Sequence, residues 1–162
     1  MLELFVYTIK LEGNDMAALS LLPPDIVQQY GLPTEAVIGE VDHRHPDMTP
    51  EHFTPNDKFL DLLSGVIRAH APSLESIQKQ VAKIDNGPVY VVDRRSANRG
   101  ERPPYEDVIG WFGVRNGELQ LDSWNPNPNY KLLTNAGPIE LESALEPHLI
   151  DAVWAALGSL GE

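Results

Sequence analysis

The sequence predicts an α+β fold, a mostly antiparallel sheet of about four to five strands packed by a helical hairpin and a C-terminal helix. Two stretches of alternating apolar residues within 108–124 are separated by an Asn-Gly pair, the signature of a type I′ β-hairpin. Apolar residues also recur at helical spacing in the middle of the chain and near its end. Strand and helix patterns alternate too irregularly for a doubly wound parallel sheet. The chain of 162 residues has the size of one domain, so we expect a single α+β domain over 1–162.

The N-terminal quarter predicts strands and one short helix. Residues 2–10 are apolar on both alternating faces, which is typical of a covered strand and predicts a central position in the sheet. The segment 16–22 fits either a short helix or a strand. Residues 25–30, which follow a proline and precede a glycine, predict a short helix. Residues 36–41 predict a further strand.

Two amphipathic helices are expected between about residues 55 and 85, because apolar side chains recur there three or four positions apart. Pro72 lies between the two apolar stripes and ends the first helix. Since the connection is short, the two helices should form a helical hairpin. A last helix with the same spacing is expected over about residues 146–157.

The hairpin at 108–124 has a register that the sequence specifies. Asn116 and Gly117 occupy the two turn positions, both of which need positive φ in a type I′ turn. A two-residue turn predicts four cross-strand pairs: Arg115–Glu118, Val114–Leu119, Gly113–Gln120 and Phe112–Leu121. The apolar pairs then share one face, and Trp111 lies on the other face, opposite Asp122.

Composition narrows the class of protein. The chain has no cysteine, which excludes disulfides, thiolate nucleophiles and cysteine-bound metals. Its start lacks the basic residues of a signal peptide, and no apolar stretch approaches the ~20 residues that span a bilayer. We therefore expect a soluble, cytoplasmic protein with no membrane partner. The formal net charge of −12 argues against duplex nucleic acid as a partner.

Histidines and carboxylates cluster within residues 40–52. Asp42, His43, His45 and His52 are the candidate metal ligands, because imidazole and carboxylate are ligands of zinc, manganese and iron. The cluster lacks a His-Glu-x-x-His spacing and contains prolines, so a solvated surface loop is the alternative. No cofactor is expected apart from a divalent metal at this loop.

An arginine-rich loop follows the short strand expected near residue 90. Arg94, Arg95, Arg99 and Arg102 carry planar donor groups that suit phosphate or carboxylate, and they are the candidate anion-binding residues. The loop lacks the glycine spacing of a phosphate-binding loop. Internal pairing of these arginines with nearby carboxylates is the alternative.

A segment of alternating asparagine and proline lies between two aromatic residues. Such a segment is stiff and extended, with outward amides, and tryptophan and tyrosine provide contact area at low entropy cost. The candidate partner-binding residues are Trp124, Asn125, Asn127, Asn129 and Tyr130.

No catalytic constellation is apparent, since no serine has a Gly-x-Ser-x-Gly context. Acidic residues dominate the C-terminal third, with seven acids and one base over 118–162. The sequence therefore favours a small acidic interaction module that binds a protein partner, such as a basic protein. An immunity protein that inhibits a basic toxin and an accessory subunit of a complex are examples of such a module. The alternative is a metal- or anion-dependent enzyme that acts on a phosphorylated or otherwise anionic substrate through the loops 40–52 and 93–107. In that case His43 or His45 should lie near Arg94 or Arg99.

Overall fold

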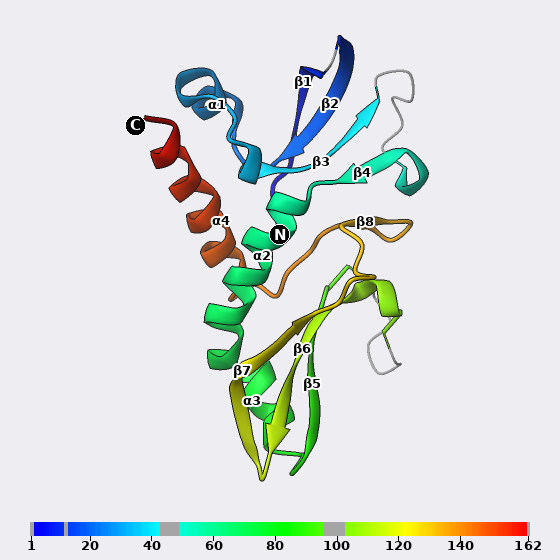
Figure 1. The fold of residues 1–162 in the computed structure, drawn as a ribbon, viewed down its shortest axis with the longest axis vertical. Helices are drawn as coiled ribbons and strands as arrows, with labels where there is room; N and C mark the ends of the chain where they lie inside the picture. The colour runs from blue at the N-terminus through cyan, green and yellow to red at the C-terminus, as the bar shows by residue number, and fades with distance from the viewer. Residues whose placement is uncertain (1, 12, 43–48, 96–102, 162) are drawn as a thin grey trace.

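The computed structural model describes residues 2–11, 13–42, 49–95 and 103–161, and its elements form an α+β fold (Figure 1). The strands are β1 (Phe5–Leu11), β2 (Asn14–Ser20), β3 (Val37–Asp42), β4 (Phe53–Pro55), β5 (Gly87–Val92), β6 (Val108–Arg115), β7 (Glu118–Pro126), β8 (Leu133–Thr134) and β9 (Gly137–Pro138). The helices are α1 (Pro24–Tyr30), α2 (Asp57–His70), α3 (Glu75–Val81) and α4 (Glu146–Ala155). The expected fold class and the C-terminal helix are confirmed. No helix in these described ranges is long and apolar enough to cross a membrane.

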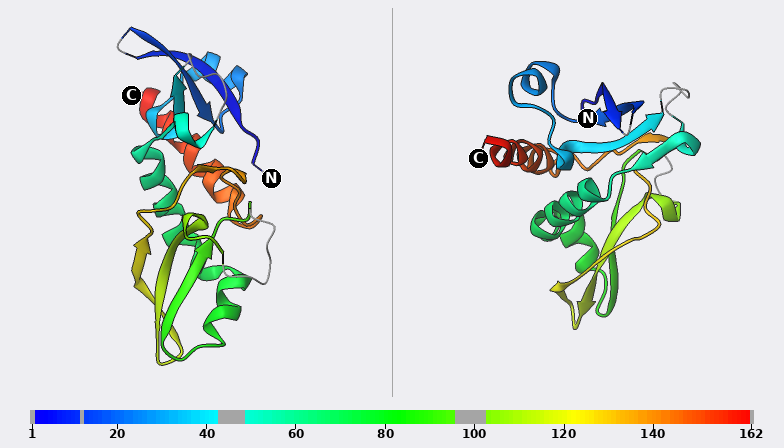
Figure 2. Two further views of the ribbon diagram at one scale, coloured as in Figure 1. Left: turned by 90° about the vertical axis from the view of Figure 1, so that its right-hand side faces the viewer. Right: turned by 45° about the horizontal axis from the view of Figure 1, so that its top comes forward.

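The strands are divided between two main sheets, and within each sheet the neighbouring strands that the structure describes are antiparallel. One sheet has the order β1-β2-β3-β4, the other has the order β5-β6-β7, and β8 and β9 form a small ribbon. The two sheets lie at opposite ends of the long axis, and α2 runs from one toward the other (Figures 1 and 2). At a rise of 1.5 Å per residue, its 14 residues span about 21 Å. The helix therefore carries the chain from the first sheet toward the second.

The central position expected for the first strand is wrong, because β1 is an edge strand that pairs with β2 alone among the described strands. Val6 on this strand is 58% exposed. Apolar residues on both faces of a strand indicate what covers those faces, and they carry no information about strand order. The ambiguous segment 16–22 belongs mostly to β2, since all seven residues of β2 pair with β1.

One cluster of buried apolar side chains contains contributions from both main sheets and from α2 and α4. The largest fully buried side chains include Ile38, Phe59, Leu63, Phe112 and Leu149. The helix α2 contacts α4, and its last residue, His70, stacks on His148 with ring centroids 3.6 Å apart. Although α2 packs against several elements, it keeps an exposed side, formed by Asp57, Lys58, Asp61, Gly65, Arg68 and Ala69.

The β6–β7 hairpin follows the predicted register near its turn and then departs from it. Asn116 and Gly117 have φ values of 52° and 77°, as a type I′ turn requires. The three predicted pairs next to the turn are confirmed: Arg115–Glu118, Val114–Leu119 and Gly113–Gln120.

The predicted pair Phe112–Leu121 is wrong, and Trp111 lies opposite Asn125, not opposite Asp122. The register shifts between Trp111 and Gly113, and Leu121 is left 60% exposed. At this bulge the Ser123 hydroxyl accepts a hydrogen bond from the Gly113 N–H at 2.7 Å, so a side chain replaces a partner of the ladder. A bulge of this kind is set by side-chain packing, which the alternation of residues cannot show.

Candidate functional site

The aromatic and asparagine segment 124–130 begins in the last residues of β7 and runs beside α2, and the structure gives its five candidate residues different roles. Asn125 and Asn129 are exposed, Trp124 is half-buried, and Asn127 and Tyr130 are buried. The segment is therefore only partly available to a partner.

Asn127 holds the segment to the start of β6. Its amide nitrogen donates hydrogen bonds to the carbonyls of Tyr105 and Val108, at 2.9 and 2.8 Å. Its backbone N–H donates to the Ile109 carbonyl at 2.9 Å, and its side-chain oxygen accepts from the Asn129 N–H at 3.0 Å. These contacts fix the path of the chain, so the Asn-Pro segment is preorganised.

Trp124 joins this segment to α2. Its indole Nε1–H donates to the Ser64 hydroxyl at 2.8 Å, and its ring packs on Phe112 with centroids 4.9 Å apart. The indole lies across Gly110, where a Cβ atom would approach the ring to 2.4 Å. A glycine is therefore needed at position 110 for the indole to reach the helix.

A groove of about 460 Å³ lies between α2 and the segment that starts at Trp124. Among the residues that the structure describes, its lining combines apolar side chains with two carboxylates, two hydroxyls and an amide, and it contains no basic residue. The lining residues are Asp57, Leu60, Asp61, Leu63, Ser64, Ile109, Trp124, Pro126, Asn127, Pro128 and Tyr130.

The charge of the groove comes from α2. Asp57 and Asp61 are exposed and stand one helical turn apart, and neither forms an ion pair with another described residue. Asp57 gains from its place in the first turn of the helix, where negative charge is favourable. Like charges at this spacing repel each other, so the pair costs the isolated helix a few tenths of a kcal/mol, about 0.2–0.5. A cation bound in the groove would remove this repulsion.

Arg95, a candidate for anion binding, lies inside the protein with its guanidinium occupied. Its Nε donates to the Asp107 carboxylate at 2.8 Å, and one terminal nitrogen donates to the Lys131 carbonyl at 2.5 Å. Its other terminal nitrogen lies 3.7 Å from the Asp93 carboxylate. The alternative of internal pairing therefore describes Arg95.

Asp93 is the centre of this buried cluster. Its carboxylate accepts hydrogen bonds from the Tyr130 hydroxyl at 2.6 Å, the Arg95 N–H at 2.9 Å and the Glu140 N–H at 3.2 Å. Burial raises the pKa of Asp93 above its ordinary value, although the Tyr130 hydrogen bond and the Arg95 charge lower it. Burial and the charge of Asp93 together hold the pKa of Tyr130 well above 10. Tyr130 therefore acts as a neutral donor, and its ring forms a fixed part of the groove.

Of the other three candidate arginines in the loop, the structure describes only Arg94. Arg94 is half-exposed and pairs with Glu142 at 3.2 Å, and Glu142 also accepts a hydrogen bond from the Ser76 hydroxyl at 2.7 Å. Arg99 and Arg102 lie outside the described residues. Anion binding by this loop therefore stays a prediction, and Arg95 is the member whose donors are already engaged.

The metal site also stays a prediction, because His43 and His45 lie outside the described residues. His52 is exposed, with its Nδ1 2.9 Å from the Thr49 hydroxyl, and Asp42 is the last residue of β3. Among the residues that the structure does describe, no three histidine or acidic side chains gather in a way that could hold a metal ion. The expected approach of His43 or His45 to Arg94 or Arg99 stays a prediction for the same reason.

Sequence reasoning missed the helical wall of the groove, formed by Asp57, Leu60, Asp61 and Ser64. In the sequence these residues belong to the polar side and the edge of an amphipathic helix, a pattern shared by most surface helices. Ser64 and its partner Trp124 are 60 positions apart, so no local signal connects them.

The site therefore consists of one groove with a fixed apolar wall and an acidic wall, next to a buried ionic cluster that holds Tyr130 in place. The chain matches no protein-family model, no curated protein and no solved structure, so this geometry is the basis for assigning a function.

Proposed function

We propose that the protein is a small acidic interaction module that binds a basic protein partner in the groove between α2 and the Asn-Pro segment. The observation that carries the proposal is the lining of this groove, in which apolar surface adjoins the carboxylates of Asp57 and Asp61, neither of which pairs with a described cation. We assign the module to the cytoplasm, because a cysteine-free chain needs no oxidising compartment.

Both halves of the lining favour a partner of this kind. Burial of apolar surface contributes about 25 cal/mol per Å² removed from water, and this term supplies affinity. The two carboxylates and the net charge of −12 attract basic partners and repel acidic ones, and this term supplies selectivity and speed of association. The preorganised Asn-Pro segment lowers the entropy cost of binding.

Capture from a lysate of the source organism at low and at high salt tests this function. The full-length chain should retain a basic protein at low salt and release it at high salt, because screening weakens the attraction. Leu60→Arg should abolish retention, since it places a bulky cation in the groove.

Leu121→Arg is the matched control, because it makes the same change at a residue that is 60% exposed on the hairpin and does not line the groove. Thermal melts should show that both variants fold. Absence of a partner at either salt, or full retention by Leu60→Arg, would contradict the proposed function.

A further inference from the structure

We propose that the groove recognises one lysine or arginine side chain in an extended segment of the partner. The apolar stem of this side chain lies on Trp124, and its charged end lies between Asp57 and Asp61. This inference rests on the proposed function and adds the chemistry of the partner to it.

The order of residues along α2 supports this arrangement. Asp57, Asp61 and Ser64 are spaced four and three residues apart, so they follow one face of the helix. At 1.5 Å per residue this face covers about 10 Å from Ser64 to Asp57. Ser64 marks the position of the indole, and Asp61 lies one turn closer to the helix start. The wall therefore changes from aromatic to anionic over about the length of an extended lysine side chain.

The indole presents ring surface and no hydrogen-bonding group to the groove. Its one N–H is already used by Ser64, and Phe112 and Gly110 pack against the ring. Ring surface packs well against methylene groups, and it attracts cations by about 0.5–2 kcal/mol. Lysine and arginine combine both features, since they bury their stems along apolar surface and keep the charged end in contact with water or carboxylate.

Other occupants match the lining less well. A purely apolar side chain would take water away from Asp57 and Asp61 without compensation, which is unfavourable. A phosphate group or an acidic segment would be repelled by the carboxylates of Asp57 and Asp61. A second copy of this chain would bring a further net charge of −12. A basic side chain satisfies the apolar and the acidic parts of the groove together.

The test is an NMR titration of the full-length protein with a blocked Gly-Leu-Lys-Leu-Gly peptide. The indole N–H signal of Trp124, identified by its loss in Trp124→Phe, should shift with the amides of residues 57–64. The same peptide with an acetylated lysine keeps the stem and loses the charge, and it should bind about tenfold more weakly, a difference of about 1.4 kcal/mol.

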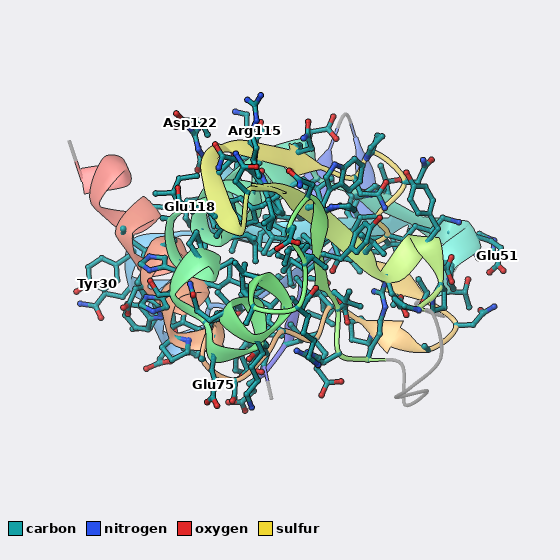
Figure 3. All side chains as sticks on the ribbon, turned by 90° about the horizontal axis from the view of Figure 1, so that it is seen from below. Tyr30, Glu51, Glu75, Arg115, Glu118 and Asp122 are labelled. Atoms are coloured by element: carbon teal, nitrogen blue, oxygen red, sulfur yellow. The ribbon has the colours of Figure 1, made fainter. Side chains whose placement is uncertain are left out.

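Matched protein variants separate the groove from general electrostatics. Asp57→Asn/Asp61→Asn should weaken binding of the lysine peptide by about tenfold. Glu118→Gln/Asp122→Asn removes the same number of charges from the hairpin, where Figure 3 shows Asp122 and Arg115 projecting outward, and it should leave binding unchanged.

Two results would overturn the inference and leave the proposed function standing, provided that a partner is captured and that Leu60→Arg abolishes its capture. The first is equal affinity for the lysine and acetyl-lysine peptides. The second is equal weakening by the groove pair and the hairpin pair of substitutions. Failure to capture any partner is a different result, which removes the proposed function and leaves the peptide titration to decide the chemistry of the groove.

Discussion

Tyr130 illustrates how a residue chosen for its surface chemistry is used inside the protein. The sequence places it beside exposed asparagines, but its hydroxyl donates to the Asp93 carboxylate at 2.6 Å, and Arg95 lies 5.4 Å from its ring centre. Asp93 also accepts a hydrogen bond from the Glu140 N–H, and Arg95 donates one to Asp107. Four separate parts of the chain therefore meet at this cluster. Each buried polar atom has a partner there, as a stable buried ionic cluster requires.

The raised pKa of Tyr130 predicts a loss of stability at alkaline pH. Below pH 10 the phenol is neutral in both the folded and the unfolded chain. Above that pH the unfolded chain releases the proton while the folded chain keeps it, so the free energy of unfolding falls as the pH rises. Tyr130→Phe removes this contribution. It should also cost about 1–2 kcal/mol at neutral pH, because Asp93 loses a donor.

Urea unfolding measured from pH 8 to above pH 10 checks this prediction. The wild-type free energy of unfolding should fall more steeply with pH than that of Tyr130→Phe. Tyr90→Phe, at a half-exposed tyrosine for which no comparable hydrogen bond is described, serves as the control. Parallel pH profiles for the wild type and Tyr130→Phe would show that the hydroxyl of Tyr130 titrates as in the unfolded chain.

At the scale of elements, the groove is formed where β6, β7 and α2 meet. β6 supplies a glycine, β7 places an indole across it, and α2 supplies the hydroxyl that holds the indole. The bulge in β7 contributes as well, because it changes the register between the turn and Trp124. The position of the indole thus depends on three elements together.

Two glycine substitutions should therefore have opposite effects on stability. Gly110→Ala places a Cβ atom 2.4 Å from the Trp124 ring and 2.5 Å from the Asn125 carbonyl, which should cost about 1–3 kcal/mol. Gly65→Ala lies within α2, where a Cβ atom meets nothing within 4 Å, and should stabilise the helix by about 0.5–1 kcal/mol.

Chemical denaturation gives both free energies, and the indole N–H signal of Trp124 reports the local change. Gly110→Ala should move this signal, and Gly65→Ala should leave it in place. A Gly110→Ala variant as stable as the wild type would mean that the indole does not need the space above β6.

At the scale of the whole molecule, two sheets at opposite ends of the long axis share one buried apolar cluster through α2 and α4. The net charge of −12 spreads over this elongated body, and most of the acidic side chains whose burial the structure describes are exposed. Self-repulsion of like charges destabilises a compact state, and salt screens it.

Moderate salt should therefore raise the melting temperature. Thermal melts from low to physiological ionic strength in sodium chloride measure the effect. Glu118→Gln/Asp122→Asn removes two of the charges and should show a smaller rise than the wild type. A melting temperature that falls with added salt would mean that attractive ion pairs outweigh repulsion in this protein.

Local chemistry explains which features the sequence predicts well. The type I′ turn follows from Asn116 and Gly117, because their backbone preferences act without help from distant residues. The three pairs next to the turn follow from it, and the helices follow from apolar periodicity. Prediction fails farther from the turn, where Leu121 is exposed and Ser123 enters the ladder, since packing against other elements decides the register there.

The sequence by itself determined the α+β class, the turn, the helices and the acidic charge, because each depends on neighbouring residues or on composition. Only the tertiary structure decided that β1 is an edge strand, that Arg95 and Tyr130 point inward, and that α2 forms a wall of the groove. These features depend on contacts between residues far apart in the chain, such as Ser64 and Trp124. Such contacts are selected by the sum of many packing and hydrogen-bond energies, and no single stretch of sequence carries that sum.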